Sequence, residues 1–308
     1  MNILITGGTG FIGRHLVAAL LKQQHKIVLF CRDIDKARRL YGDSVSYVYY
    51  FRDVLIDIDA VVNLAGEPIM DKRWTKKRRS QLRSSRIGVT RHLNKWISKV
   101  ETPPKVMISG SAVGYYGNHP EGEALDEFAN SRSCFPSRLC SEWEFEALKA
   151  RSLGTRVCLL RTGVVLDKNA GALQKMWTPF SLGLGGNVAS GKQWFSWIHI
   201  HDMVEAILFL LDNPETEGVF NATAPTPVMY QEFTKTFAKT LKRPHVFPMP
   251  AFVLALLFGE TSQLLTEGQR VIPKGLLDAG FTFRYPTIKD ALDNIIQTPS
   301  SVFDGYSN

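Results

Sequence analysis

Three glycines near the amino end have a spacing that suits a dinucleotide phosphate. Gly7, Gly10 and Gly13 follow an apolar segment at residues 3–5 and precede a stretch with apolar side chains on one helical face. Glycine here permits a tight turn, close approach of the backbone to a pyrophosphate, and close packing of helix on strand. The phosphates would then lie at the helix N-terminus, where free N–H groups and the helix dipole favour an anion. This segment therefore predicts a dinucleotide-binding unit.

The end of the second predicted strand indicates which dinucleotide binds. An NAD site usually has an acidic residue there, which holds the ribose 2′-hydroxyl. This chain has Cys31 and then Arg32, with Asp33 one step further on. An arginine at this point suits a 2′-phosphate, which favours NADP (NADPH). The alternative is that Arg32 is a solvated surface side chain.

One short segment carries most of the positive charge. Residues 71–86, DKRWTKKRRSQLRSSR, hold eight basic side chains and one acidic side chain, in a chain whose formal net charge is +8. A nucleic-acid binder usually spreads its basic footprint over several elements. We therefore expect no nucleic-acid partner, we disfavour an anionic-lipid surface, and we expect the segment to border the cofactor cleft.

The order of apolar segments indicates an α/β protein. Strand-like runs (NILIT, KIVLF, AVVNLA, KVMIS, RVCLLR) alternate with amphipathic stretches in a chain of 308 residues. This order predicts a doubly wound parallel sheet of the Rossmann type. Because the pattern loosens after about residue 165, we expect an NADP-binding domain over 1–220 and a smaller C-terminal α/β lobe over 221–308. Residues 170–196 are expected to contribute to that lobe.

The apolar runs and the cysteines indicate where the protein is located and what it binds. The apolar run AFVLALLF at residues 251–258 is too short to span a bilayer, and no signal peptide is visible. The four cysteines show no C-x-x-C pair and no metal-ligand spacing. We expect a cytoplasmic protein with reduced thiols, no metal and no membrane span. A homodimer stays open.

Longer motifs carry a family resemblance over essentially the whole chain. ITGGTGFIG, VVNLAG and WIHIHDM resemble an extended short-chain dehydrogenase/reductase (SDR). NLAGEPI, KRWT, SRIGVT, SGSAVGYYG, GKQWFSWIHIHD, PMPAFVLALLFGE and AGFTFRYP resemble one atypical branch, the epimerase family proteins, which carry a C-terminal domain of unknown function. The resemblance implies a Rossmann-type fold and NADP binding, and it implies no known substrate. The expected cofactor contacts are Gly7, Thr9, Gly10, Phe11, Ile12, Gly13, Cys31, Arg32, Leu64, Ala65, Gly66, Glu67, Gln81, Arg86 and Val164.

Arg86 is a charged residue on an apolar helical face. Residues 78–100 read as one helix in which Leu82, Arg86, Val89 and Leu93 share a stripe. In extended relatives an N-x-x-G-T motif occupies this helix, so Arg86 replaces an asparagine that lies near the cofactor. We hypothesise that Arg86 reaches a cofactor phosphate, with Gln81 nearby. Alternatively, its long side chain extends off the end of the stripe.

The usual catalytic pair of short-chain reductases is missing. Those enzymes use a tyrosine acid assisted by a lysine four residues on, together with a serine that orients the substrate carbonyl. Ser111 matches the serine, but Cys134 and Arg138, or Phe135 and Leu139 if the alignment shifts by one residue, stand at the tyrosine and lysine positions. Tyr115 or Tyr116 is left as a candidate acid, and packing of the loop is the alternative role for both.

Candidate substrate residues occur in two segments. Nucleotide-sugar enzymes often hold the diphosphate with an arginine at the position where this chain has Phe195. A nucleotide-sugar epimerase is therefore the less favoured function for this chain. The aromatic residues around it suggest an apolar ligand, with core packing as the alternative, and we expect Asp202 to cap the following helix. Glu67 and Arg73 could pair with each other or with a ligand. The expected substrate contacts are Arg73, Trp74, Trp194, Trp197 and His199.

Two functions remain open from the sequence. The first is an NADP-dependent oxidoreductase or epimerase-like enzyme acting on a small, fairly apolar carbonyl or quinone. In it, Ser111 would orient the substrate and Tyr115 or Tyr116 would donate the proton. The second is a non-catalytic NADP(H)-sensing module that reports redox state to a partner. The absent Tyr–Lys pair favours the second function, and Ser111 with the aromatic residues favours the first.

Overall fold

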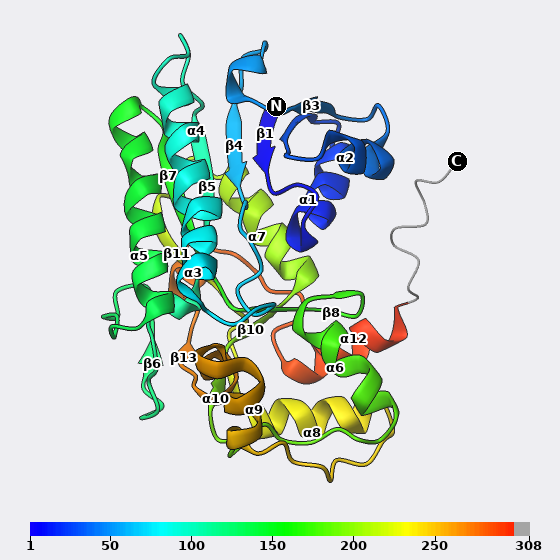
Figure 1. Cartoon of the computed structure of the whole chain (residues 1–308). Helices are drawn as coiled ribbons and strands as arrows, with labels where there is room; N and C mark the ends of the chain where they lie inside the picture. The colour runs from blue at the N-terminus through cyan, green and yellow to red at the C-terminus, as the bar shows by residue number, and fades with distance from the viewer. Residues whose placement is uncertain (299–308) are drawn as a thin grey trace.

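The computed structural model describes residues 1–298, and its centre is one parallel sheet (Figure 1). Seven strands pair side by side, which confirms the predicted doubly wound sheet. In spatial order they are β11 (Gly218–Ala222), β7 (Arg156–Thr162), β5 (Val106–Ala112), β4 (Ala60–Asn63), β1 (Asn2–Thr6), β2 (Lys26–Phe30) and β3 (Ser46–Val48). The strands are rich in apolar residues because both faces of the sheet are covered.

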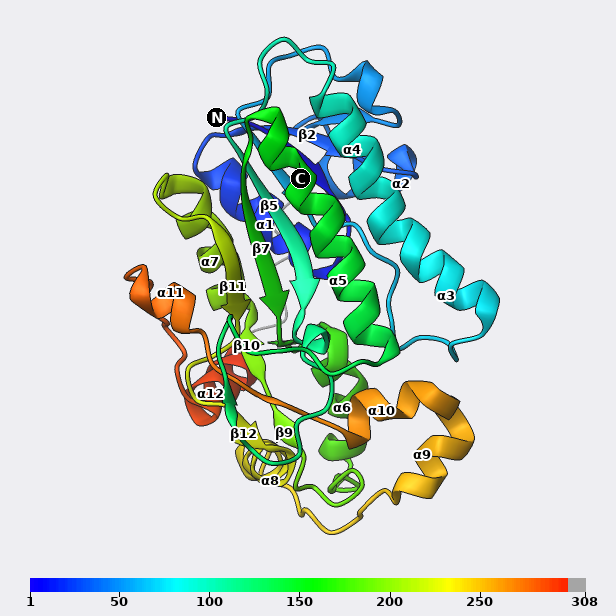
Figure 2. The ribbon, with the colours of Figure 1, turned by 90° about the vertical axis from the view of Figure 1, so that its left-hand side faces the viewer.

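Helices cover both faces of the sheet. Because side chains alternate between the two faces along each strand, each strand contributes to two hydrophobic cores. Ile3 and Ile5 of β1 belong to the core that also contains residues of α1 (Phe11–Lys22) and α7 (Ile200–Asp212). Leu4 points to the opposite core. Figure 2 shows α4 and α5 on that side of the sheet. The remaining elements of this domain are α2 (Ile34–Tyr41), η1 (Phe51–Asp53), α3 (Lys76–Arg83), α4 (Val89–Ile97), η3 (Val113–Tyr115), β6 (Ala124–Leu125), α5 (Phe135–Leu148) and η4 (Lys149–Leu153).

The helix predicted over residues 78–100 is interrupted. α3 and α4 are joined by one π-helical turn, η2 (Ser84–Gly88). π-helical turns are rare and occur frequently at functional sites, because they shift the side chains that follow by one position. Here the turn contains Arg86, the charged residue on the apolar stripe.

A second, smaller core lies below the sheet in Figure 1. Its residues come from 164–197 and from 224–296, so two separate stretches of chain build this lobe. The predicted boundary after residue 220 falls inside β11, which ends at Ala222. The elements of this half are β8 (Val164–Asp167), α6 (Gly171–Ser181), β9 (Trp194–Phe195), β10 (Trp197–His199), β12 (Val228–Met229), α8 (Tyr230–Thr240), α9 (Ala251–Phe258), η5 (Gly259–Ser262), α10 (Gln263–Thr266), β13 (Arg270–Val271), α11 (Lys274–Asp278) and α12 (Ile288–Gln297).

Residues 1–298 have neither a membrane-crossing helix nor a cluster of metal-ligating side chains. In this part of the chain, no helix is both long enough and apolar enough to cross a membrane. The same residues contain no group of three or more His, Cys, Asp and Glu side chains arranged to hold a metal ion.

Candidate functional site

The glycine turn has the shape that a bound pyrophosphate requires. Gly7 has φ of +75°, and a Cβ atom on it would lie 2.6 Å from the backbone of Leu64. A Cβ on Gly13 would lie 2.3 Å from the carbonyl oxygen of Gly7. α1 begins directly after Gly10, whose position is not capped by a side chain. The first N–H groups of α1 are therefore available to an anion, and the turn fits a dinucleotide.

The loop after β4 is held beside this turn by buried hydrogen bonds. The Thr6 hydroxyl donates to Asn63 Oδ1 (2.7 Å) and accepts from the backbone N–H of Ala65 (3.1 Å). The Asn63 amide nitrogen donates in turn to Thr90 (2.8 Å) and Ser109 (3.2 Å). This network fixes residues 64–66 next to the glycine turn, at the carboxyl ends of β1 and β4. Ligands of open α/β sheets bind at that edge.

Arg32 lies at the carboxyl end of β2 and stays largely exposed. Its side chain is 80% exposed, and its guanidinium donates to Glu67 Oε1 (3.0 Å). Arg78 contacts the other oxygen of Glu67 (3.2 Å). Hydrogen bonds from Arg32, and then from Arg78, lower the pKa of Glu67. Asp33 caps α2 by accepting from Lys36 N, so this nearby carboxylate is already engaged.

Arg86 lies directly beneath the loop that follows β4. One guanidinium nitrogen donates to the backbone carbonyl of Glu67 (2.9 Å), and the charge lies over the Trp143 ring, 5.5 Å from its centroid. A Cβ on Gly66 would lie 3.0 Å from the Arg86 guanidinium carbon. Burial lowers the pKa of Arg86. The side chain therefore does not extend away from the protein, and its predicted contact with a phosphate stays a prediction.

Arg73 and Trp74 make contacts that differ from the expected ones. Arg73 does not pair with Glu67, because its guanidinium donates to the carbonyl oxygens of Leu256 and Leu257 at the end of α9. Cations at a helix C-terminus are favoured by the exposed carbonyls and the dipole. Trp74 is buried against Phe135, with ring centroids 4.9 Å apart. A basic hollow of about 390 Å³ lies beside them, lined by Lys72, Arg73, Thr75, Lys77, Arg78 and Gln81.

Ser111 belongs to a buried ionic network. Its hydroxyl donates to Glu144 Oε1 (2.6 Å), and both oxygens of Glu144 accept from Arg161 (2.9 Å each). Burial opposes the charge on Arg161, but its hydrogen bonds to Glu144 raise its pKa overall. A serine hydroxyl has a single proton to donate. That proton is already given to Glu144, which argues against Ser111 as the donor that orients a substrate carbonyl.

The two candidate tyrosines have different surroundings. Tyr116 is fully buried, donates to Asn221 Oδ1 (2.7 Å) and accepts from Arg161 (3.1 Å), and burial raises its pKa to about 12. We therefore correct its assignment as a proton donor, because its proton is held in the core. Tyr115 is half-buried, and the Arg161 guanidinium carbon lies 3.3 Å from its ring centroid. At the position of the usual lysine, Arg138 is exposed and donates to Ser133.

Besides Trp74, two more of the expected substrate contacts lie in the core. Trp197 is 0% exposed, and its indole N–H donates to Thr226 O (3.2 Å). His199 is 4% exposed, and its Nδ1 accepts the backbone N–H of His201 at the start of α7. Both expectations need correction, because these side chains have almost no surface that a substrate could contact. Packing explains the pattern of alternating aromatic and histidine residues.

Trp194, Val164 and Asp202 are the remaining predicted residues of this region. Trp194 is half-buried, with the Arg270 guanidinium 5.0 Å from its ring centroid. Val164, the first residue of β8, is half-buried. The expected role of Asp202 as helix cap is wrong. Its carboxylate accepts from the backbone N–H groups of Arg284 (2.9 Å) and Tyr285 (3.0 Å), and so ties α7 to the segment before α12.

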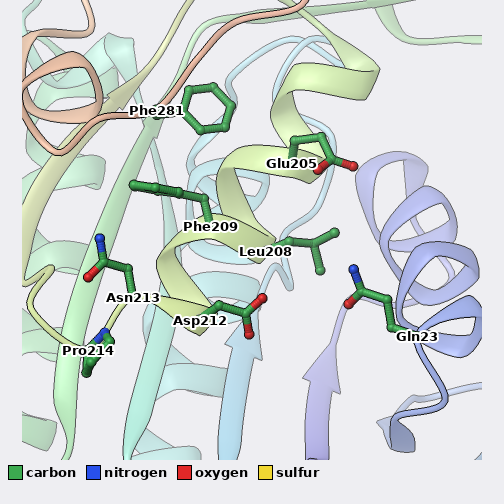
Figure 3. A pocket seen from close by; sticks show the side chains of 8 residues that line it. All are labelled: Gln23, Glu205, Leu208, Phe209, Asp212, Asn213, Pro214 and Phe281. Atoms are coloured by element: carbon green, nitrogen blue, oxygen red, sulfur yellow. The ribbon is translucent and has the colours of Figure 1, made fainter.

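A larger hollow lies at the opposite end of the sheet, near the amino ends of its strands (Figure 3). Its volume is about 480 Å³, and Gln23, Glu205, Leu208, Phe209, Asp212, Asn213, Pro214 and Phe281 line it. Gln23 follows α1 and precedes β2, so the hollow faces the amino ends of the strands. Ligands of such sheets bind beyond the carboxyl ends of the strands, so this hollow lies away from the end at which the glycine turn stands.

The sequence interpretation missed Glu144 and Arg161. Glu144 lies between Glu142 and Glu146 in the run SEWEFEAL and does not stand out, whereas Arg161 is the one charge in the apolar strand run VCLLRT. A charge in such a segment is costly unless it is paired. That signal was available for Arg161, although the identity of its partner was not.

The comparisons with known proteins agree with this fold. The model of the NAD dependent epimerase/dehydratase family matches residues 3–222, and a domain of unknown function (DUF1731) matches residues 249–295. The Arabidopsis thaliana epimerase family protein SDR39U1 homolog, chloroplastic, is 40% identical over 96% of this chain and 87% of its own length. Bacillus subtilis epimerase family protein YfhF is 37% identical over 98% and 100%.

A solved structure adds a cofactor to the comparison. The crystal structure of human epimerase family protein SDR39U1 (isoform2) with NADPH aligns with a TM-score of 0.88 and 34% identity, over 97% of this chain and 100% of that one. A nucleoside-diphosphate sugar epimerase from Corynebacterium glutamicum aligns with a TM-score of 0.76 and 29% identity, over 95% of this chain and 57% of that one. The glycine turn, the seven-stranded sheet and these matches together show that the chain belongs to the NAD dependent epimerase/dehydratase family, in its extended SDR-like branch of epimerase family proteins.

Proposed function

We propose that the chain binds NADP(H) and acts as an oxidoreductase on a small, fairly apolar carbonyl or quinone. The glycine turn and the uncapped start of α1 would hold the pyrophosphate, and Arg32 would hold the 2′-phosphate. Residues 64–67, supported by Arg86, would hold the ribose side of the cofactor. The bound cofactor would supply or accept a hydride.

One observation carries the choice of an enzyme. Tyr115 follows the carboxyl end of β5, is half-buried, and within residues 1–298 its hydroxyl has no hydrogen-bond partner. The buried Glu144–Arg161 pair places a cation on its ring face. Tyr115 is thus the one tyrosine of the two that is free to give a proton to a substrate oxygen. The glycine turn and Tyr115 both lie at the edge of the sheet where ligands bind.

The proposal is tested with purified protein in two steps. The first is a fluorescence titration with NADPH and with NADH, for which we expect tight NADPH and weak NADH binding. The second measures NADPH oxidation with a panel of small carbonyls and quinones. Tyr115→Phe should lower kcat by about a hundredfold or more, the usual contribution of a general acid. Tyr49→Phe removes a hydroxyl from an exposed tyrosine and is the control.

A specific observation also favours the sensing module. The Ser111 hydroxyl donates its hydrogen bond to Glu144, and the Tyr116 hydroxyl donates its hydrogen bond to Asn221. Two of the three predicted catalytic groups are therefore engaged in buried hydrogen bonds of the core. NADPH binding without turnover of any carbonyl or quinone would favour this second function. Full activity of Tyr115→Phe would remove Tyr115 from the mechanism.

A further inference from the structure

The segment around α9 exposes an unusual amount of apolar surface. Phe252 and Leu256 are each 73% exposed, and Leu257 is 55% exposed. The segment before the helix exposes Val246 and Phe247 in the same way. Residues 244–259 contain no Asp, Glu, Lys or Arg. Contiguous exposed apolar patches of this kind mark binding surfaces rather than ordinary protein surface.

A second loop extends this patch. A Cβ on Gly183 would lie 3.2 Å from Pro244, and the backbone N–H of Phe247 donates to Gly185 O (3.4 Å). The two leucines beside Gly183, Leu182 and Leu184, are exposed. We call the exposed apolar side chains of both segments the α9 surface: Leu182, Leu184, Val246, Phe247, Met249, Phe252, Leu256 and Leu257.

Unpaired cations border the α9 surface on two sides. The hydrogen bonds from Arg73 to Leu256 and Leu257 hold the basic loop against the end of α9, and an ion pair joins Arg79 to Glu260. Figure 2 shows α3 and α9 projecting on the same side of the molecule. The exposed cations of the basic loop are Lys72, Lys76 and Lys77. Two more exposed cations, Lys242 and Arg243, precede the apolar segment. Among the described residues none of these five has an ion-pair partner.

We propose that the α9 surface docks on an anionic membrane surface, with its apolar side chains in the interface and the bordering cations at the lipid phosphates. α9 has 8 residues, about 12 Å of helix, which is too short to span a bilayer. Apolar side chains beside lysines and arginines are the composition of interfacial anchors. The basic segment alone did not favour an anionic-lipid surface, and the exposed apolar side chains beside it reverse that expectation. The inference goes beyond the proposed function and does not depend on it.

The charges distinguish this occupant from a second copy of the chain. A two-fold interface places the same patch on both sides. It would bring the cations around each α9 surface, Lys72, Lys76, Lys77, Lys242 and Arg243, toward those of the other copy. Like charges facing each other across an interface are unfavourable. An anionic lipid surface instead supplies the opposite charge.

The experiment is co-sedimentation of the full chain with vesicles of phosphatidylcholine alone and of an equimolar mixture with phosphatidylglycerol. We expect binding to the mixed vesicles, weakened by added salt, and little binding to phosphatidylcholine. The double variant Lys76→Gln/Lys77→Gln should lower partitioning about twenty-fivefold, because each lysine contributes about fivefold. Phe252→Ser/Leu256→Ser should lower it by about tenfold or more.

Matched controls separate this surface from general stickiness. Lys95→Gln/Lys99→Gln removes two exposed lysines from the end of α4 and its following turn, and Leu55→Ser/Phe145→Ser removes two exposed apolar side chains elsewhere. Both controls should bind as the parent does, and all variants should keep its unfolding midpoint. Absence of binding to mixed vesicles, or equal binding to both vesicle types, would overturn the proposal. So would a concentration-dependent dimer that the Phe252→Ser/Leu256→Ser variant abolishes, since the surface would then join two copies.

Discussion

The Ser111 hydroxyl donates a 2.6 Å hydrogen bond to Oε1 of Glu144, and the same carboxylate forms an ion pair with Arg161. All three side chains are buried. Breaking one member of a buried ionic network is costly, because the charge that remains has lost part of its solvation. The serine that matches a catalytic position in sequence therefore contributes to the stability of the core.

Replacing Ser111 tests this contribution. Ser111→Ala should lower the free energy of unfolding by about 1–3 kcal/mol, because the buried Glu144 carboxylate loses one of the three hydrogen bonds that it accepts. Chemical denaturation measures the change. Ser98→Ala is the control, since Ser98 is exposed and bonds only to the nearby Lys95 carbonyl. Equal stability of Ser111→Ala and the parent would contradict the network.

The glycine turn gives a second prediction. Gly13→Ala should abolish detectable cofactor binding or greatly weaken it, and should destabilise the fold by about 1–3 kcal/mol. The added methyl would lie 2.3 Å from Gly7 O, so the turn must open. Gly88→Ala is the matched control, because its Cβ meets nothing closer than 3.5 Å. Normal NADPH affinity in Gly13→Ala would mean that the turn does not hold the phosphates.

The choice between the two dinucleotides depends on Arg32. Arg32→Ala should weaken NADPH binding by about 1.5–3 kcal/mol, the value of a hydrogen bond to a charged group, and leave NADH affinity unchanged. Titrations with both dinucleotides measure the two changes. Arg39→Ala, an exposed arginine of α2, is the control. An equal loss for both dinucleotides would show that Arg32 does not discriminate the 2′-phosphate.

Arg86 gives a related prediction for the neighbouring loop. Arg86→Ala should weaken NADPH binding by about 1.5–3 kcal/mol, because the guanidinium either contacts a phosphate or holds the Glu67 carbonyl in place. Arg83→Ala removes a more exposed arginine from the end of α3 and is the control. An unchanged dissociation constant would show that residues 64–67 keep their position without Arg86.

Stability should depend on pH through His199. Burial, followed by the neighbouring charge on His201, lowers the pKa of His199 to about 3. The unfolded chain, with an ordinary histidine pKa near 6.5, takes up this proton first as the pH falls. Stability from this group is therefore complete above about pH 6.5 and is lost toward pH 3, by at most about 1.4 kcal/mol per pH unit.

The variant His199→Asn isolates this effect. Asparagine can still accept the His201 N–H at the start of α7, but it does not titrate. The slope of the free energy of unfolding against pH between 6 and 4 should be shallower by up to about 1.4 kcal/mol per unit. His92→Asn, an exposed histidine of α4, should keep the parent slope. Equal slopes for His199→Asn and the parent would contradict the low pKa.

Local patterns in the sequence were enough to predict the cofactor half of the fold. The glycine spacing and the alternation of apolar runs with amphipathic stretches act over a few residues, and each was confirmed by the strands, helices and turn that formed. Gly7 shows why, since its positive φ and its contact with the backbone of Leu64 admit no side chain. The family motifs lie mostly in these same local units.

The roles of the polar core residues were decided by the tertiary structure. Ser111 meets Glu144 across 33 positions of sequence, and Tyr116 meets Asn221 across 105. No periodicity encodes such a pair, because the partner depends on which strand lies beside β5 and which turn of α5 packs over it. By itself the sequence determined that this chain folds into a parallel sheet with a glycine turn between the first strand and the first helix. Only the packing of distant segments decided that Ser111 and Tyr116 serve the core while the Tyr115 hydroxyl has no hydrogen-bond partner among residues 1–298, because buried polar groups bond to whichever partners the folded chain brings within reach.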